Sequence, residues 1–394
     1  MSTQAPTARP FRLAVNTGGG DAPGLNAVIR SVVLSALNLG WEVFGIQRGY
    51  EGLMTDGGVV RLDRNSVEGI THEGGTILGT TNRGNPFAWP RSNGPSEAVD
   101  RSREVLDAFR RHGLDALIAI GGDGSLYIAS ELSERGLPVV GVPKTIDNDL
   151  AATQVTFGFH TAVDTATEAI DKLHSTARSH ERIMVVEVMG RHTGWIALYA
   201  GISGSADAIL IPEIPFRAEA VAQAIRLKYE RGPRYAVVVV AEGAAPAGKS
   251  ASLVDEGAPG RSPRYGGIGE KVAKELAELT GFESRSMVLG HLQRGGEPTA
   301  YDRLLALRFG TAAVDMVAQR QFGCMVALQP PQYREGERRP LTFVPEVRAV
   351  PLKEAIAERK TVPRDSDIVL TARRLGISFG DEEAAEGAAV PAKS

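Results

Sequence analysis

Short apolar runs alternate with longer amphipathic segments along most of the chain. LAVNT (13–17) precedes LNAVIRSVVLSALNLG (25–40), and ALIAI (116–120) precedes LYIASELSERG (126–136). Apolar residues recur at helical spacing in the longer segments, whereas the short runs are nearly continuous in aliphatic residues. Such runs are typical of parallel strands that are buried on both faces and connected by helices. The pattern predicts further strands at 41–46, 139–143, 182–189, 208–212, 235–243 and 286–291.

The number of these β–α units indicates an α/β protein with two doubly wound, mostly parallel-sheet, Rossmann-like lobes. A chain of 394 residues also exceeds the usual size of a single hydrophobic core. Ligands of such folds bind in loops at the carboxyl ends of strands, so we expect the active site in the cleft between the lobes. The expected first lobe comprises 11–158 and about 293–343, and the expected second lobe comprises 159–292 and about 344–380.

Composition and charge exclude several classes of protein. Hydrophobic residues make up 43% of the chain and charged residues 23%, as in an ordinary soluble globular protein. The formal net charge of −3 argues against a nucleic-acid or membrane partner, and no apolar run approaches the roughly 18 residues of a membrane span. The opening MSTQAPTARP lacks the apolar region of a signal peptide. Because the single cysteine, Cys324, fits a reducing compartment, we expect a cytoplasmic protein.

Three segments lack the strand–helix pattern. The stretch 244–267 is rich in Gly, Ala, Ser and Pro and is expected to form a long surface loop. The ends of the chain, 1–10 and 381–394, are expected to be disordered tails.

Two glycine-rich loops follow predicted strands and precede predicted helices. GGGDAPG (18–24) allows backbone N–H groups to approach an anion closely, at a helix N-terminus whose dipole favours negative charge. It lacks the GK[ST] of a P-loop, and a tight βα turn is the alternative interpretation. GGDGS (121–125) contains an acid, and Asp123 beside a polyphosphate would need a bridging cation such as Mg²⁺. The alternative is that Asp123 caps the following helix.

A third loop, PKTIDND (143–149), places Lys144, Asp147 and Asp149 after another predicted strand. One of the two carboxylates can act as a general base on a hydroxyl group, while the other serves the metal or orients the loop. A solvated Asx-type turn is the alternative interpretation.

Basic side chains occupy comparable positions beside other predicted strands. They are Arg83, Arg182, Arg191, Arg285, His291 and Arg294. The planar guanidinium suits phosphate oxygens, although any single one of these could be an ordinary surface arginine. Several of them combined with an acidic Mg²⁺ site imply two phosphorylated ligands, one of them metal-bound. This pattern predicts phosphoryl transfer from a nucleotide or pyrophosphate to an acceptor that is already phosphorylated.

Together these loops make the chain resemble the 6-phosphofructokinase family. Within that family it is most similar to the phosphofructokinase A type, and to the mixed ATP/pyrophosphate-like subgroup of that type. Six motifs in family order carry the resemblance: GGGDAPGLNAVIR (18–30), GGTILGTTNR (74–83), GGDGS (121–125), PKTIDND (143–149), RIMVVEVMGRHTGWIAL (182–198) and GHLQRGGEPTAYDR (290–303). The resemblance implies that fructose 6-phosphate is phosphorylated at its C1 hydroxyl to fructose 1,6-bisphosphate, in glycolysis. A lipid or NAD kinase shares only GGDG, and a non-catalytic sugar-phosphate-binding protein is disfavoured because the acid and metal positions are intact.

The resemblance also implies roles for individual residues. Asp147 would accept the proton of the C1 hydroxyl, with Thr145, Asp149 and Arg191 as further catalytic residues, and Asp123 would hold Mg²⁺. In the first, donor-binding lobe the implied ligands of ATP are Gly20, Arg83, Gly84, Gly122, Asp123, Gly124 and Ser125. The implied ligands of the sugar phosphate, mostly in the second lobe, are Thr145, Ile146, Asp147, Met189, Gly190, Arg191, Glu242, His291, Leu292, Gln293 and Arg294. Arg182 and Arg285 would complete the sugar-phosphate site of a neighbouring subunit, which implies a homo-oligomer, either a dimer or a tetramer.

Two positions bear on the phosphoryl donor, and they disagree. Pyrophosphate-using members of the family typically carry Asp at the position of Gly124, where a carboxylate would repel a nucleotide. They carry Lys at the position of Lys144, where many ATP users carry Gly. Because a carboxylate at 124 would penalise ATP directly and a lysine at 144 need not exclude anything, we expect ATP as donor, with pyrophosphate as the alternative. The resemblance assigns no function to the residues after about 320.

Overall fold

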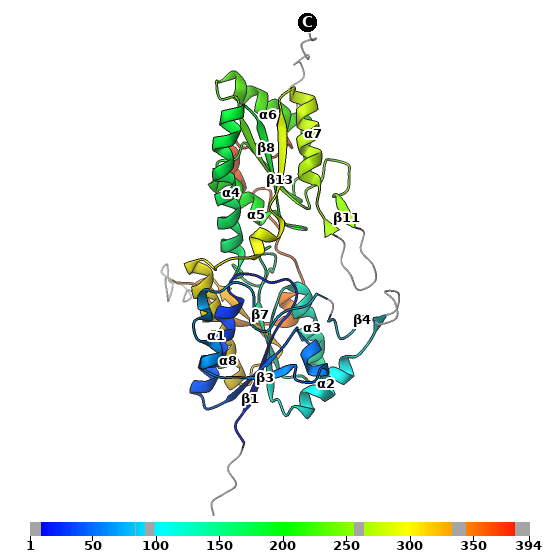
Figure 1. Cartoon of the computed structure of the whole chain (residues 1–394), viewed down its shortest axis with the longest axis vertical. Helices are drawn as coiled ribbons and strands as arrows, with labels where there is room; N and C mark the ends of the chain where they lie inside the picture. Colours follow the sequence, from blue (N-terminus) through cyan, green and yellow to red (C-terminus); the bar gives the residue numbers. More distant parts are fainter. Residues whose placement is uncertain (1–8, 83, 91–97, 256–263, 333–343, 383–394) are drawn as a thin grey trace, which may run out of the picture. The chain divides into compact units, whose positions relative to one another are not determined.

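The computed structural model describes residues 9–82, 84–90, 98–255, 264–332 and 344–382, which form two compact units (Figure 1). Unit 1 comprises the described residues up to Thr161 and those from Arg294 to Lys360. Unit 2 comprises the described residues of 162–255, 264–293 and 361–382. Each unit contains its own sheet, and both sheets are mostly or wholly parallel, as the sequence predicted.

Unit 1 is built on a seven-stranded sheet with the order β15-β14-β7-β6-β1-β2-β3. Its five inner strands are mutually parallel: β14 (Cys324–Gln329), β7 (Val139–Pro143), β6 (Ala116–Gly121), β1 (Arg12–Thr17) and β2 (Glu42–Ile46). The two edge strands, β3 (Val59–Leu62) and β15 (Glu346–Pro351), are antiparallel to their neighbours. β6 and β7 are buried at every position, because helices cover both faces of the sheet.

The helices of unit 1 lie on opposite faces of this sheet (Figure 1). α1 (Leu25–Asn38) packs against α8 (Ala300–Ala318) on one face, and Gly310 allows the close approach because a Cβ there would overlap Ser31. The other face is covered by α2 (Ser102–Arg111), α3 (Asp123–Glu134) and α9 (Leu352–Ala355), whose apolar residues form one core with the strands. Smaller elements are η1 (Glu51–Met54), η2 (Asn65–Val67), η3 (Ile70–His72), and the antiparallel pair β4 (Trp89–Pro90) and β5 (Ala98–Val99).

Unit 2 contains a four-stranded parallel sheet with the order β13-β8-β10-β9. Its strands are β13 (Ser284–Val288), β8 (Ile183–Val188), β10 (Ala236–Ala241) and β9 (Ala208–Leu210). α4 (Phe159–His180) begins in unit 1 and continues into unit 2, which also contains α5 (Trp195–Ser203), α6 (Ala218–Glu230), α7 (Ile268–Thr280) and α10 (Asp367–Arg374). η4 (Gly290–Arg294) belongs to unit 2 except for its last residue, Arg294, which belongs to unit 1. α6 and α7 pack on one face of the sheet and share a core with β8, β9 and β10.

One predicted strand, at 286–291, is less buried than expected. The run at 286–291 was predicted as a strand buried on both faces, whereas β13 ends at Val288 and is largely exposed. Met287 and Val288 are 43% and 57% exposed. The reason is its place in the sheet, since β13 is an edge strand and residues 290–294 form a 3₁₀ turn instead.

The boundary between the units also differs from the expected lobes near residue 344. Residues from about 344 were expected in the second lobe, but β15 completes the sheet of unit 1 and the chain enters unit 2 only after Lys360. The described parts of the expected loop 244–267 include an antiparallel pair, β11 (Leu253–Asp255) and β12 (Arg264–Tyr265). Residues 256–263 of that loop, and 1–8 and 383–394 of the expected tails, lie outside the described residues. None of the helices in the described ranges has the length and apolar composition of a membrane crossing.

Candidate active site

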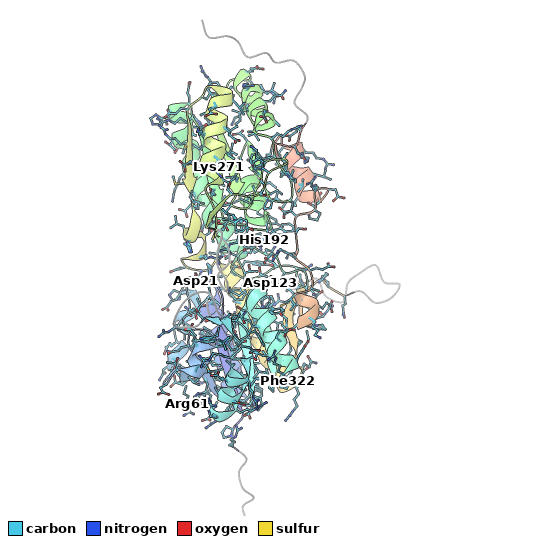
Figure 2. All side chains as sticks on the ribbon, turned by 90° about the vertical axis from the view of Figure 1, so that its right-hand side faces the viewer. Asp21, Arg61, Asp123, His192, Lys271 and Phe322 are labelled. Carbon is cyan, nitrogen blue, oxygen red and sulfur yellow. The ribbon has the colours of Figure 1, made fainter. Side chains whose placement is uncertain are left out.

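The three loops singled out in the sequence meet at one edge of the sheet of unit 1. They follow β1, β6 and β7, which are adjacent and parallel, so their carboxyl ends lie together. The N–H of Gly18 donates to the carbonyl of Ile120 over 2.9 Å, and the N–H of Lys144 donates to the carbonyl of Gly121 over 2.8 Å. Figure 2 shows Asp21 and Asp123 at this end of the unit, opposite Arg61 and Phe322.

Close packing fixes the backbone of the first loop. A Cβ on Gly18 would lie 2.6 Å from Ser125 Oγ and 3.2 Å from its Cβ, so glycine favours this close contact between the loops 18–24 and 121–125. Gly19 has φ +77°, and its N–H donates to the carbonyl of Thr81 over 3.2 Å. The hydroxyl of Thr80 donates to the carbonyl of Gly19 over 2.6 Å. The loop is therefore held in place by its neighbours, with glycine backbone at its surface.

The second loop opens helix α3. Gly122 is the N-cap residue and Asp123 is the first residue of the helix, so the alternative that Asp123 is the cap is wrong. Its side chain is 48% exposed, and its carboxylate pairs with Arg359, Oδ2 to Nη2 3.3 Å. Gly124 is exposed, and a Cβ added to it would meet no described atom within 4 Å. The start of α3 therefore combines open backbone with one accessible carboxylate, an arrangement suited to a metal-bound phosphate.

The third loop turns sharply between its two aspartates. Asn148, between them, has φ +51° and is buried, as is Ile146, whereas Thr145, Asp147 and Asp149 are partly exposed. The hydroxyl of Thr145 accepts from the N–H of Asp147 over 3.1 Å. Burial, and next the negative charge of Asp147, raise the pKa of Asp149 to about 6. The two carboxylates therefore share one electrostatic environment.

Lys144 lies beneath the first loop and is 3% exposed. Its ammonium donates to the carbonyl of Gly20. Burial, and next the positive charge of Arg294, lower the pKa of Lys144 to about 8. Arg294 itself donates to the carbonyl of Asp21, Nη1 to O 3.1 Å. Lys144 is therefore not part of a solvated turn, and both cations support the backbone of the loop 18–24.

Two further basic residues, Arg359 and Lys360, lie at this site, and no sequence motif predicted them. The guanidinium of Arg359 pairs with Asp123, as described above, and it also faces the carboxylate of Asp149, Nε to Oδ2 3.6 Å. The ammonium of Lys360 donates to Asn148 Oδ1 over 2.8 Å and to the carbonyls of Thr153 and Gln154 over 3.0 Å each. Both residues belong to the segment after α9, which matched no motif. Nothing local in that segment distinguishes them from surface charges.

The two carboxylates that face Arg359 fit a magnesium ion. Mg²⁺ in phosphoryl-transfer sites is usually held by one or two carboxylates together with water and phosphate oxygens. Asp123 and Asp149 already face one cationic group, so they present their oxygens to a common region. Within the described ranges no cluster of three or more His, Cys, Asp or Glu side chains is placed to hold a metal by itself. The site therefore fits a cation that is also held by a phosphorylated ligand.

A second group of predicted residues converges in unit 2. Arg191 pairs with Glu242, Nε to Oε1 3.4 Å, and the N–H of Gly243 donates to the carbonyl of Gly190 over 3.0 Å. A Cβ on Gly243 would overlap the carbonyl of Arg191, so glycine is required where these two loops meet. The buried Gln293 accepts from the N–H of Met189 over 3.3 Å. Three distant motifs are thus brought together at the ends of β8, β10 and β13.

Glu213 is a further residue of this region that no sequence motif predicted. It accepts from the N–H of Gly194, which precedes α5, at 3.1 and 3.0 Å. It also accepts from the N–H of Val362 over 2.8 Å. Burial raises the pKa of its carboxyl. Glu213 therefore ties the end of the loop 190–194 to the segment that follows Lys360.

The remaining predicted residues are more dispersed. His291 and Leu292 are exposed in η4 of unit 2, and Arg294 belongs to unit 1. Arg182 pairs with Glu283, Nε to Oε2 2.7 Å, and Arg285 pairs with the other oxygen of the same carboxylate. Gly84 is buried beside Thr81, whereas Arg83 lies outside the described residues.

Known proteins resemble this chain along most of its length. A family model described as Phosphofructokinase matches residues 12–317. The chain is 53% identical over 371 residues to the ATP-dependent 6-phosphofructokinase of Chloroflexus aurantiacus, with 94% of this chain and 98% of the relative covered. It is 51% identical over 356 residues to the pyrophosphate–fructose 6-phosphate 1-phosphotransferase of Amycolatopsis methanolica, with 90% and 96% covered.

A solved structure shows the same fold. The phosphofructokinase of Pichia pastoris in the T-state superposes with a TM-score of 0.72 at 30% identity, over 90% of this chain and 36% of that longer chain. Because the family model spans more than three quarters of the sequence and close relatives match along nearly their whole length, the chain belongs to the phosphofructokinase family.

Proposed function

We propose that the protein transfers the γ-phosphoryl group of ATP to the C1 hydroxyl of fructose 6-phosphate, giving fructose 1,6-bisphosphate, as a cytoplasmic enzyme of glycolysis. The observation that carries this proposal is the meeting of the loops 18–24, 121–125 and 144–150 at the ends of three adjacent parallel strands. They combine glycine backbone, an accessible aspartate at a helix start, and two further aspartates in one environment. These are the parts that phosphoryl transfer requires.

The donor ligands belong to unit 1 in this proposal. The loops at Gly20, Gly84 and Gly122–Ser125 would hold the phosphates through backbone N–H groups and the N-terminus of α3. Asp123, with Asp149 beside it, would hold Mg²⁺, which when bound neutralises charge on the phosphate oxygens. The ammonium of Lys144 donates to the carbonyl of Gly20, so it stabilises the conformation of the loop 18–24 in the donor-free protein.

Asp147 is the proposed general base. Its carboxylate takes the proton of the C1 hydroxyl while the hydroxyl oxygen bonds to the γ-phosphorus and the bond from that phosphorus to the bridging oxygen breaks. ADP is then the leaving group. Thr145 orients the backbone of Asp147. Arg191 is proposed as a further catalytic residue, whose positive charge would stabilise the transferring group.

The sugar phosphate would be held mainly by unit 2. The loop of Met189, Gly190 and Arg191 meets Glu242, whose carboxylate can accept hydrogen bonds from sugar hydroxyls. His291 and Arg294, with Leu292 and Gln293 between them, are the proposed contacts of the 6-phosphate, because a histidine and an arginine can share its negative charge.

A coupled assay tests the proposal. Purified protein with MgATP and fructose 6-phosphate should form fructose 1,6-bisphosphate, detected through aldolase and a dehydrogenase that consumes NADH. Omission of either substrate is the control. If no product forms with ATP or pyrophosphate although fructose 6-phosphate still binds, the protein is a sugar-phosphate-binding protein and not a kinase.

Pyrophosphate is the second candidate donor, and Lys144 is the observation that favours it. An ammonium near the donor phosphates could offset the charge of pyrophosphate. The relative from Amycolatopsis methanolica carries the name of a pyrophosphate-dependent enzyme at 51% identity, nearly as similar as the ATP-dependent relatives. In this chain, however, the ammonium of Lys144 is engaged with the carbonyl of Gly20. It can therefore support the loop for either donor.

We further propose that the protein is a homo-oligomer and that β13 lies at the interface. β13 is an edge strand with exposed backbone and side chains, and Met287, Val288 and the nearby Leu292 are 43%, 57% and 69% exposed. Native proteins rarely leave an apolar edge strand uncovered. Arg285, on this strand, would thereby reach the neighbouring subunit, with Arg182 beside it across Glu283.

Complementation between inactive variants should reveal shared sites. Arg285→Ala and Asp147→Asn should each be nearly inactive alone, and dilution of the unmodified protein to monomers should remove activity while each unit stays folded. If the assembly is a dimer, equimolar mixing should restore roughly a quarter of the sites, because half of the dimers are hybrids and each hybrid contains one intact site. Activity of the mixture, with subunit exchange followed by fluorescence transfer, measures this.

The control for complementation replaces one parent by a double variant. Arg285→Ala combined with Asp147→Asn, mixed with Asp147→Asn, can form no intact site and should stay inactive. If the first mixture also stays inactive although its subunits exchange, each site is complete within one chain.

A further inference from the structure

The segment after α9 covers the acidic edge of the site in unit 1. The guanidinium of Arg359 lies 3.3 Å from Asp123 Oδ2 and 3.6 Å from Asp149 Oδ2. Arg359 and Asp123 are 39% and 48% exposed at their side chains, whereas Asp149 is 13% exposed. One half-exposed cation therefore faces two carboxylates that come from different loops.

The backbone around Arg359 is anchored while its side chain is not enclosed. Arg359 forms an antiparallel bridge with Leu150, and the N–H of Lys360 donates to the carbonyl of Asp149 over 2.8 Å. The ammonium of Lys360 is bonded to Asn148, Thr153 and Gln154. The guanidinium is thus held near the carboxylates but can leave them by rotation of its own side chain.

Charge explains why a cation is needed there. Arg359 is within ion-pair distance of both Asp123 and Asp149, and Asp147 lies two positions before Asp149 in the same loop. Without Arg359, three aspartates would repel one another in the protein that holds no donor. A free divalent cation would relieve the same repulsion, so it must compete with Arg359 for the same oxygens.

We propose that Arg359 is a positioning residue that occupies the carboxylates of Asp123 and Asp149 in the donor-free protein and opposes the binding of free Mg²⁺. The metal then enters together with the donor, whose phosphate charges balance both the ion and the arginine. This inference rests on the proposed function only for the assignment of Asp123 to the metal. It gives the residues after about 320 a role in the donor site that no motif indicated.

Binding of Mn²⁺ to the nucleotide-free full chain tests the proposal, with the free ion counted by electron paramagnetic resonance. Arg359→Gln should bind Mn²⁺ about tenfold more tightly than the unmodified protein, the change expected when one unit charge about 5 Å from a divalent ion is removed at a solvent-exposed site. Arg359→Lys keeps the charge and should stay close to the unmodified protein. Adding Asp123→Asn to Arg359→Gln should abolish the gain.

Arg61→Gln is the matched control. Arg61 is also an exposed arginine of unit 1 that pairs with a carboxylate, that of Glu42, but it lies at the opposite end of the unit from Asp123 (Figure 2). It changes the net charge equally and should leave Mn²⁺ affinity unchanged.

Unchanged or weaker Mn²⁺ binding by folded Arg359→Gln would overturn the proposal, as would an equal gain from Arg61→Gln. If Arg359→Gln fails to fold, Arg359→Met is measured in its place with the same expected gain. The coupled assay is run on the unmodified protein in parallel. An active enzyme with no gain on Arg359→Gln contradicts only this inference, whereas the absence of product contradicts the proposed function.

Discussion

Asp147→Asn is expected to lower kcat by about 10²–10⁴-fold with little change in KM for fructose 6-phosphate, because general-base catalysis typically contributes that factor. Asparagine preserves the shape of the side chain but cannot accept the proton of the C1 hydroxyl. The variant should remain as stable as the unmodified protein, since the charge of Asp147 raises the pKa of Asp149 and its removal relieves repulsion. Initial rates and thermal melting, measured on the same preparation, check both statements.

Asp107→Asn is the matched control for this prediction. Asp107 is an exposed acid on α2 of the same unit and pairs with Arg110. It should leave kcat unchanged. A kcat for Asp147→Asn within a few-fold of the unmodified enzyme would show that another group accepts the proton.

Gly124→Asp is expected to lower kcat/KM for MgATP by about 10–100-fold through charge repulsion near the donor phosphates, while use of Mg-pyrophosphate falls less. The structure offers a clean test, because Gly124 is exposed and a Cβ there would meet no described atom within 4 Å. The aspartate side chain should therefore fit without moving the loop 121–125. The change in kcat/KM should then come from its interaction with the donor. Rates with each donor at saturating fructose 6-phosphate measure the change.

Gly124→Asn separates charge from bulk in this experiment. The neutral side chain should reduce ATP use much less than aspartate does, and an equal loss would assign the effect to size. The same assay on the unmodified enzyme decides the donor. A higher kcat/KM for pyrophosphate than for ATP would reverse the proposed preference and make Lys144 the more informative of the two positions.

The donor loops were predictable because the signals that form them are local. Apolar runs specify strands, and the glycines and charged residues directly after them must lie at the carboxyl edge of a parallel sheet. Asp123, Asp147 and Asp149 could therefore be placed at one site before the order of the strands was known. The order β7-β6-β1 then brought their loops together.

The environment of a charged residue was not predictable in the same way. Arg294 was predicted as a ligand of phosphate and Lys144 as a position that bears on the choice of donor. In the structure both side chains also donate to backbone carbonyls, those of Asp21 and Gly20 respectively. The sequence shows that a cation is present, but its partner depends on how distant loops pack. The same holds for β13, whose aliphatic residues resemble those of a buried strand although its place at the sheet edge exposes them.

The sequence by itself determined the α/β class, the strand-end loops and the chemistry of phosphoryl transfer, because each depends on residues that are close in the chain. Only the tertiary structure decided that Arg359 and Lys360 lie on the loop of Asp149, more than 200 positions away in the chain. It also decided that Glu213 joins Gly194 to Val362. Such contacts arise when packing of the whole unit brings segments together, and neither periodicity nor motif spacing encodes them.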